Sequence, residues 1–319
     1  MSKSDGGSEP RETSHRGHGF QGTFGNIILA VFAVIAAMWI MTAVGCGMTA
    51  ANDATYGADV ERIHVYTLDV GQGDAHVIRT KDGITMIDTG DVAHRPRTVQ
   101  MLKDLGVEKI DRLIVTHPHS DHLGGFRAIV DEIPIGVVYE NGYSHGSSVY
   151  RTYVKTVKRL DIPVKVARSG DVIDLGGGAT FEVYAPWSDP ILDGKGRPDP
   201  NNNSIVGKLV YGKFSMLFTG DAEAEEENRL VKEKNSKLFS RVLKVPHHGS
   251  NGSSGIKFLK SVKAEIAVIP VGLANDYGHP GNASMQRLES VGTSIYRTDL
   301  QGTIHIVTDG KTWSIETER

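Results

Sequence analysis

The chain has 319 residues, enough for a tail followed by one large domain or for two ordinary domains. Lys and Arg number 35 against 38 Asp and Glu, so the formal net charge of −3 excludes a strongly basic nucleic-acid coat protein and an acidic solvating tail. The single cysteine, Cys46, excludes a disulfide scaffold and any zinc site built from clustered thiolates. Any metal must therefore be held by carboxylates and by the 13 histidines.

The first 60 residues predict a targeting segment rather than part of a folded domain. Residues 1–26 are rich in Gly, Ser and charge without periodicity, which predicts a disordered tail. Residues 27–46 follow, and their apolar stretch 27–44 carries no charge. It is long for a secretory signal and near the lower limit for a membrane span; a buried core helix is disfavoured, because the stretch is apolar on every face. Residues 47–60 are small and polar and predict a linker.

Residues 43–46 (AVGC) resemble the cleavage box of bacterial lipoproteins, in which the cysteine becomes lipidated. Ala43 stands where Leu is usual, and no net positive charge precedes the apolar stretch. A lipid on Cys46, an uncleaved membrane anchor and clean secretion all stay open. Each places the rest of the chain outside the cytoplasm, so we expect an extracytoplasmic protein anchored to the membrane, with secretion as the alternative. No protein partner is predicted.

From Glu61 onward, short β-rich runs alternate with helical stretches. The first half predicts strands at 62–68, 75–80, 84–88 and 113–116, and helices at 97–105, 123–131 and 149–160. The second half predicts strands at 181–184, 204–211, 214–218, 241–245, 265–271 and 294–297, helices at 222–235, 253–261 and 282–290, and a last hairpin across Asp309-Gly310. The pattern predicts one layered α/β domain over residues 61–319.

The strongest chemical feature is the run THPHSDHLGG at residues 116–125, between an apolar strand and a helix. A turn at the end of a strand lets alternate side chains converge, so His117 and His119 can point at one spot, and Asp121 and His122 at an adjacent one. Imidazole and carboxylate suit Zn, Mn or Fe. A polar loop with incidental histidines is a much poorer explanation of four such side chains at this spacing.

The HxHxDH run resembles the metallo-β-lactamase superfamily. More narrowly, segments 68–75 (LDVGQGDA), 218–221 (FTGD), 245–250 (VPHHGS) and 277–280 (YGHP) resemble, in the same order, the C-terminal hydrolase domain of ComEC-type DNA-internalisation competence proteins. The resemblance spans residues 61–310 and implies the α/β metallo-β-lactamase fold, a four-layer αβ/βα sandwich. Since the many membrane spans of the channel are absent, we expect a free-standing relative tethered by its N-terminal segment.

The resemblance implies roles for residues outside that run. Asp88 would hold a ligand histidine in the right tautomer; the alternative is a turn residue before Gly90. Asp221 stands where the superfamily places a carboxylate bridging two metals, and it could also cap the following helix. One of His247 and His248 should complete the second metal. We favour His247, the first side chain past the preceding strand, which leaves His248 as a general acid or phosphate contact.

Further residues are candidates for contacts with substrate. His279 could act as an acid or bind substrate, or it could be an ordinary loop residue. Ser250 offers a hydroxyl to an anion. Asp69 and Asp74 could be part of a tight strand connection, but the resemblance favours a place for them on the floor of the site. Lys244 is the best single candidate for a nucleic-acid contact, since it is two residues from the metal loop.

One departure concerns the histidine that the superfamily supplies between the HxHxDH run and the bridging carboxylate. Residues 201–204 (NNNS) stand there instead, as they do in the ComEC-type group. Asn203 could hold a metal-bound water or a substrate phosphate, and the more open site favours Mn over Zn. His145 is the only histidine in the interval and is the less favoured replacement.

We therefore predict an exported hydrolase with two divalent metal ions, Zn or Mn. One ion would be held by His117, His119 and Asp221, and the other by Asp121, His122, Asp221 and His247. Asp121 can also take the proton of the attacking water, and His248 or His279 can protonate the leaving oxygen. The predicted substrate is DNA or another phosphodiester. The alternatives are a hydrolase of lactones, thioesters or β-lactams, and a non-catalytic binding module.

Overall fold

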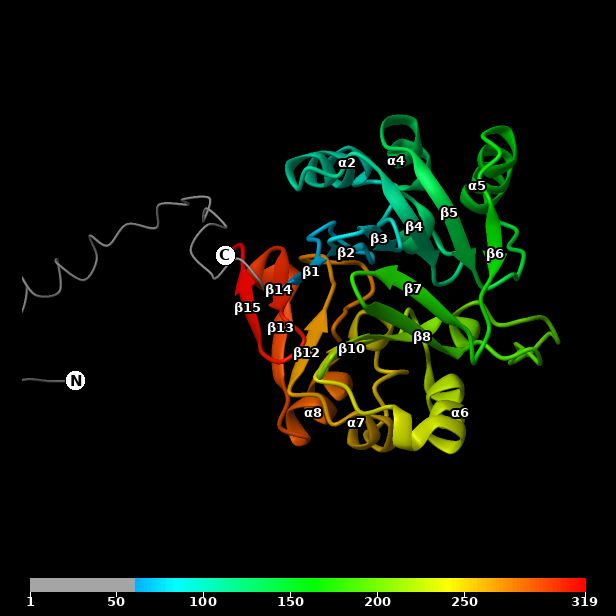
Figure 1. Ribbon diagram of the computed structural model, residues 1–319. Coiled ribbons are helices and arrows are strands. Elements are labelled where there is room, and N and C mark those ends of the chain that lie inside the picture. The colour runs from blue at the N-terminus through cyan, green and yellow to red at the C-terminus, as the bar shows by residue number, and fades with distance from the viewer. Residues whose placement is uncertain (1–60) are drawn as a thin grey trace, which may run out of the picture. The chain divides into compact units, whose positions relative to one another are not determined.

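The computed structural model describes residues 61–319 of the chain (Figure 1). The predicted tail, apolar segment, lipoprotein box and linker, with Cys46, lie outside the described residues. Within residues 61–319, no helix is both long and apolar enough to cross a membrane. The strands of this region form one sheet of eight strands and one of seven.

The first sheet is built from both ends of the described region. Its strands are Ile63–Thr67 (β1), His76–Thr80 (β2), Gly83–Ile87 (β3), Ile110–Val115 (β4), Ile135–Glu140 (β5), Val164–Val166 (β6), Ile304–Thr308 (β14) and Trp313–Thr317 (β15). They lie in the order β15-β14-β1-β2-β3-β4-β5-β6. Strands β1 to β3 are antiparallel and β3 to β6 are parallel, so the sheet changes from hairpins to strand–helix units at β3.

The second sheet repeats this change. Its strands are Val172–Gly176 (β7), Ala179–Ala185 (β8), Val206–Tyr211 (β9), Phe214–Phe218 (β10), Val242–Lys244 (β11), Ile266–Ile269 (β12) and Ser294–Arg297 (β13). They lie in the order β13-β12-β11-β10-β9-β8-β7. Strands β7 to β10 are antiparallel and β10 to β13 are parallel.

Helices cover the outer faces of the two sheets (Figure 1). Those of the first half are Arg95–Asp104 (α2), Ser120–Leu123 (α3), Phe126–Glu132 (α4) and Ser148–Arg159 (α5). Those of the second half are Ala224–Lys234 (α6), Ile256–Val262 (α7), Asn282–Ser290 (α8) and Thr298–Gln301 (α9). Residues 61–319 also contain three 3-10 turns, at Asn201–Asn203 (η2), Asn235–Lys237 (η3) and Pro246–Gly249 (η4).

Each sheet is buried on both faces, and this produces the four layers. Successive residues of β2 show it: Ile78 belongs to the apolar core between the sheets, and Val77 to the core under α2, α4 and α5. In β10, Met216 likewise joins the central core and Leu217 the core under α6 to α8. Since side chains alternate along a strand, such strands read as continuous apolar runs. The predicted four-layer αβ/βα sandwich is confirmed.

The sequence analysis missed three strands, β5, β6 and β7, and misplaced some helix ends. Strand β6 has three residues, all exposed, so it carries no apolar alternation to detect, and β7 follows it across a short loop. The helix predicted at 123–131 is split: α3 ends at Leu123 and α4 begins at Phe126, with Gly124 and Gly125 between them. The Cβ of a larger residue at Gly125 would lie 2.0 Å from the carbonyl oxygen of Thr89, so the backbones approach closely at this break.

Candidate metal centre

The predicted metal-binding side chains lie where strands of both sheets end. Asp88 follows β3 and His117 follows β4, while Asp221 follows β10 and the histidines of η4 follow β11. Carboxyl ends of neighbouring parallel strands meet at one edge of a sheet, so the side chains after them converge. The two halves of the chain meet here: Nε2 of His248 lies 3.3 Å from Oδ2 of Asp121, 127 residues away in the sequence.

Asp88 is fully buried and orients His122. One of its oxygens accepts a hydrogen bond from the backbone N–H of Thr116 at 2.8 Å. The other accepts from the Thr116 hydroxyl at 2.6 Å and lies 2.8 Å from Nδ1 of His122. Because a carboxylate only accepts, Nδ1 carries a proton and Nε2 of the ring is turned toward the site. This is the geometry of the orienting role predicted for Asp88.

Four side chains form a compact cluster of candidate ligands. Each offers one atom, and these atoms all lie within 4.8 Å of one another; the residues are Asp121, His122, Asp221 and His248. Nε2 of His122 is 3.1 Å from Oδ1 of Asp221 and 3.7 Å from Oδ2 of Asp121. Two imidazoles and two carboxylates are a donor set that suits Zn or Mn.

The chemistry of this cluster fits a cation. Nε2 of His122 and Oδ1 of Asp221 are buried without a hydrogen-bond partner among the described residues, although they face each other. Burial alone would lower the pKa of His122, but the carboxylates around it, led by Asp221, raise that pKa well above its ordinary value. A proton or a metal ion is therefore needed between the ring and the carboxylate, and the two compete for the same position.

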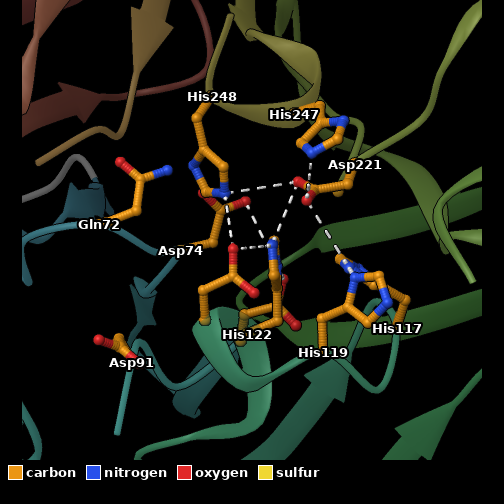
Figure 2. A network of polar contacts seen from close by, with 12 residues as sticks. Gln72, Asp74, Asp91, His117, His119, His122, Asp221, His247 and His248 are labelled. Atoms are coloured by element: carbon orange, nitrogen blue, oxygen red, sulfur yellow. Dashed lines mark hydrogen bonds and ion pairs between the residues drawn. The ribbon is translucent and has the colours of Figure 1, made fainter. Parts of the chain in front are cut away.

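Asp221 presents its two oxygens to different histidines (Figure 2). Oδ1 faces His122 at 3.1 Å and His248 at 3.7 Å. Oδ2 faces His117 at 3.7 Å and His247 at 3.6 Å. A carboxylate placed in this way can bridge two metal ions, as the sequence predicts for Asp221.

The predicted first pair of ligands, His117 and His119, lies beside the compact cluster and not within it. Nε2 of His117 is 3.1 Å from Nδ1 of His119, so the two nitrogens face the same point beside the cluster. Burial lowers the pKa of His117 well below its ordinary value, and the nearby His122 adds to this shift. His117 is therefore a neutral imidazole, the form that binds metal.

The structure reverses the predicted preference between His247 and His248. His248 is buried and belongs to the cluster with Asp121, while its Nδ1 lies 2.8 Å from the carbonyl oxygen of Pro270. Since both ring nitrogens are engaged, His248 is not placed as a free general acid. Both histidines of η4 have left-handed backbone angles, with φ of 48° and 50°. Strand alternation therefore does not decide which of them points into the site.

The compact cluster of candidate ligands opens into a cavity of about 330 Å³, called the metal cavity below. Its walls include Asp121, Asp221, His247, His248 and His279. The ring of His279 lies 5.5 Å from that of His247. Burial, with the neighbouring histidines, lowers the pKa of His279 to about 4. His279 is thus neutral near pH 7, where it can donate or accept a hydrogen bond but is a weak source of protons.

Comparison with known families agrees with the fold and the donor set. Residues 68–272 match the family model described as the metallo-beta-lactamase superfamily. The chain belongs to the metallo-β-lactamase superfamily. It is therefore a metal-dependent hydrolase by family, and its His/Asp cluster indicates divalent metal.

Individual relatives narrow the resemblance. Competence protein ComA of Neisseria gonorrhoeae is 32% identical over 286 residues, which is 86% of this chain and 38% of that protein. ComE operon protein 3 of Bacillus subtilis is 28% identical over 74% of this chain and 32% of its own length. The chain thus spans less than two fifths of these relatives, and the predicted resemblance to the ComEC-type group is confirmed. The metallo-β-lactamase fold protein YhfI of Bacillus subtilis shares the fold, with a TM-score of 0.51 at 9% identity over 80% of this chain and all of that one.

Lys244 does not contact solvent, which corrects its predicted role in binding nucleic acid. It is fully buried, and its Nζ lies 2.5 Å from Asp74 and donates a hydrogen bond to the carbonyl oxygen of Gly220 at 2.7 Å. Asp74 lies behind the cluster, 3.8 Å from Nδ1 of His122 and 3.4 Å from Nδ1 of His248. Asp74 is therefore buried behind two histidines of the cluster, and Lys244 is its ion-pair partner.

Asp69 lines a neighbouring cavity and not the floor of the metal site, where the sequence analysis placed it. Its carboxylate pairs with Arg97 and with Arg319, each at 2.9 Å. All three line a second cavity of about 490 Å³, which shares Asp121 and Tyr277 with the metal cavity. Asp69 therefore shapes the space beside the metal cluster and does not form its floor.

Asn203 and Ser250 are also placed otherwise than predicted. The amide group of Asn203 donates to the carbonyl oxygens of Ile191 and Asp199, at 2.7 and 2.8 Å, and accepts from the Ile191 N–H at 3.0 Å. The side-chain amide of Asn203 makes all of its hydrogen bonds to that loop, so it cannot also hold a metal-bound water or a phosphate. The hydroxyl of Ser250 accepts from the backbone N–H of Gly252 at 3.2 Å, and Ser250 does not line the metal cavity.

Two polar residues of the site escaped the sequence analysis. Ser204, the last residue of the NNNS segment, accepts a hydrogen bond from the backbone N–H of Asp221 at 3.1 Å and lies 3.5 Å from Nδ1 of His117. Glu223 lies 2.9 Å from Nδ1 of His247. Glu223 is one of four glutamates near the start of α6, and its position two residues after Asp221 was the available signal.

Proposed function

We propose that this chain is a dinuclear metal-dependent phosphodiesterase that cleaves DNA or another phosphodiester outside the cytoplasm. The observation that carries the proposal is the placement of Asp221 with one oxygen toward His122 and His248 and the other toward His117 and His247. Two metal ions held on either side of such a carboxylate stabilise both the attacking and the leaving oxygen of a displacement at phosphorus.

The assignment of a phosphodiester rests on the relatives and on the cavities. The relative with 32% identity is named a competence protein, and the relative with 28% identity is named ComE operon protein 3. The metal cavity of about 330 Å³ adjoins the cavity of about 490 Å³ lined by Arg97 and Arg319, which gives room for a substrate longer than one small ester. Both arginines pair with Asp69, and the lining also includes Asp91, Asp121, Asp276 and Asp299, so the second cavity is polar and carries more negative than positive side chains.

The residues of the chain divide the work of hydrolysis. Metal ions, when bound, supply the acidity of the attacking water and the charge that stabilises the transition state. Burial alone would raise the pKa of Asp121, but His122 and His248 hold it well below the ordinary value. Asp121 is therefore ionised and, with 23% of its side chain exposed, can accept a hydrogen bond from the attacking water at the wall of the cavity. His279 is placed to hydrogen-bond an oxygen of the substrate.

The anchoring of the chain is part of the proposal. The apolar stretch 27–44 and Cys46 support attachment to the membrane by a span or a lipid, with the hydrolase outside the cytoplasm. Cells grown with a radiolabelled fatty acid should incorporate the label into this protein if it carries a lipid. Loss of the label in Cys46→Ser would locate the lipid at this residue. Label retained in Cys46→Ser would contradict a lipid at this residue.

The function is tested with the purified full chain in mild detergent, loaded with Mn or Zn. We expect cleavage of linear DNA and of bis(p-nitrophenyl) phosphate, and loss of both by at least 100-fold in Asp121→Ala. Asp131→Ala, an exposed aspartate on α4, is the matched control and should cleave normally. A folded, metal-loaded protein that cleaves a lactone, thioester or β-lactam but neither phosphodiester would overturn the proposal.

A further inference from the structure

A metal ion on the Oδ2 side of Asp221 would have fewer candidate ligands than one on the Oδ1 side. Oδ1 faces two members of the compact cluster, whereas Oδ2 faces His117, with His119 next to it. The segment that replaces the missing superfamily histidine offers no substitute, because the amide of Asn203 is fully hydrogen-bonded to a loop. A metal ion at Oδ2 would therefore have two histidines and one carboxylate oxygen unless another side chain reaches it.

His247 points at this oxygen. Its Nε2 lies 3.6 Å from Oδ2 of Asp221, nearly the same distance as Nε2 of His117 on the other side of that oxygen, at 3.7 Å. Figure 2 shows Asp221 between these two rings, with His248 and His122 toward its other oxygen. The left-handed turn at η4 makes this possible, because it sends two successive histidines to different oxygens of one carboxylate.

Glu223 lies behind His247 at nearly the distance at which Asp88 lies behind His122, although only the Asp88 pair has the geometry of a hydrogen bond. Oε1 of Glu223 lies 2.9 Å from Nδ1 of His247, and the corresponding distance from Asp88 to His122 is 2.8 Å. The Glu223 carboxylate also accepts a hydrogen bond from the side chain of Asn201 at 3.2 Å. A carboxylate on the far nitrogen is the usual support of a histidine that binds metal, since it fixes the tautomer and turns the other nitrogen toward the ion.

We propose that His247 is a ligand of the metal ion held by His117, His119 and Oδ2 of Asp221, and that Glu223 is its positioning residue. This inference rests on the two-metal proposal above. The NNNS segment then has a new role: through Asn201 it steadies the carboxylate behind the replacement ligand. His145 is the competing candidate. Its ring lies 5.3 Å from that of His119, but among the described residues it has no neighbouring carboxylate like the one that Glu223 gives His247.

A cobalt–thiolate signature tests direct coordination without any substrate. Cys46 is the only cysteine, so the Cys46→Ser chain provides a background without thiols. Into it we would introduce His247→Cys or His145→Cys and load the purified full chain with Co(II), counting bound metal by mass spectrometry. We expect a thiolate-to-cobalt charge-transfer band with His247→Cys and none with His145→Cys.

Two further substitutions locate the ion that produces the band. Adding His117→Ala should abolish it, whereas adding His122→Ala should leave it. A band that survives His117→Ala but not His122→Ala would place His247 on the other metal position and overturn the inference. So would a metal-loaded His247→Cys protein without a band, or a band with His145→Cys alone. The wild-type metal count is a separate readout: one ion per chain would contradict the two-metal proposal itself.

The positioning role of Glu223 predicts a change in affinity. In Glu223→Gln, Mn should bind the weaker of the two sites 10- to 100-fold less tightly, the usual cost of losing such a support. Glu223→Asp should recover part of the loss. Glu225→Gln, on the exposed side of the same helix, is the control and should bind as wild type. Unchanged affinities in Glu223→Gln, measured by titration calorimetry, would show that this carboxylate does not position the ligand.

Discussion

The ammonium of Lys244 lies 2.5 Å from the carboxylate of Asp74, and both groups are fully buried behind the metal ligands. Burial alone would raise the pKa of Asp74, but Lys244, with His248 and His122, holds that pKa far below its ordinary value. A permanent negative charge therefore faces two of the candidate ligand histidines from behind. Removing its counter-charge would leave this carboxylate buried and unpaired.

Lys244→Met should therefore destabilise the protein strongly. Breaking one half of a buried ion pair costs about 3–5 kcal/mol, and denaturant unfolding of the metal-free protein measures it. Lys109→Met, which breaks the exposed pair with Asp111, is the control and should cost less than about 1 kcal/mol. In the double variant with Asp74→Asn, the loss should be clearly smaller than the sum of the two single losses. Simple additivity would mean that the two groups do not depend on each other.

Asp88→Asn should weaken metal binding while preserving the fold. The left-handed φ of 55° at Asp88 is one that Asn adopts readily, and the amide oxygen can still accept from the Thr116 N–H. The amide cannot provide the charged acceptor that fixes Nδ1 of His122, so we expect a 10- to 100-fold lower affinity for Mn at the compact cluster. Titration calorimetry checks this, and equal affinities of variant and wild type would refute it.

The carboxyl of Glu227 should make stability fall as the pH rises. It accepts hydrogen bonds from the backbone N–H groups of Ser254 and Gly255, and burial raises its pKa from the ordinary 4.5 to about 7. A group whose pKa is higher in the folded state binds its proton more tightly there. Its contribution is therefore complete below the unfolded pKa and is lost as the pH rises through about 7.

The loss at Glu227 between pH 5 and 8 should be at most about 3 kcal/mol. Glu227→Gln should remove this part of the pH dependence, measured as the difference in unfolding free energy between the two proteins. Glu225→Gln, an exposed neighbour on α6, should keep the slope of the wild type. If Glu227→Gln and wild type lose stability in parallel, Glu227 does not titrate in this range.

Tyr277 should matter for long substrates and not for short ones. Its side chain is 69% exposed, stacks on His279 with ring centroids 5.8 Å apart, and lines both cavities. Base stacking on an aromatic side chain contributes about 1–3 kcal/mol. Tyr277→Ala should therefore raise KM for single-stranded DNA roughly 5- to 100-fold and leave bis(p-nitrophenyl) phosphate unaffected. Leu300→Ala, an exposed apolar residue that lines neither cavity, is the control and should leave both KM values unchanged.

Sequence patterns predicted the parts of the centre that depend on strand ends. Asp88 and the HxHxDH run follow neighbouring strands of one sheet, so their convergence follows from the sheet order. Asp221 follows a buried strand of the other sheet, and only the packing of the two sheets brings it to them. The choice between His247 and His248 did not follow, because two adjacent left-handed residues have no signature in side-chain type. The pattern predicted a pair of histidines there, but not which oxygen of Asp221 each would face.

Partners distant in the sequence were equally hidden. Lys244 lies beside the metal loop and carries a positive charge, which favoured a surface role until its partner Asp74 was located in the other half of the chain. Asn203 was misjudged for a similar reason, since its amide is occupied by Ile191 and Asp199 in a loop without periodicity. In both cases the residue type was informative, but burial depended on contacts that only the folded chain supplies.

The distribution of the ligands over both sheets sets an order of events during synthesis. Asp121 and His122 leave the ribosome well before Asp221 and His248, and the contact between Asp121 and His248 closes a loop of 127 residues. At ordinary translation speed this delay is on the order of 10 s, a period in which the first group of ligands has no complementary half. The complete set of ligands therefore exists only once the second sheet has packed on the first. An ion captured earlier by the nascent chain would have to be carried into place or released.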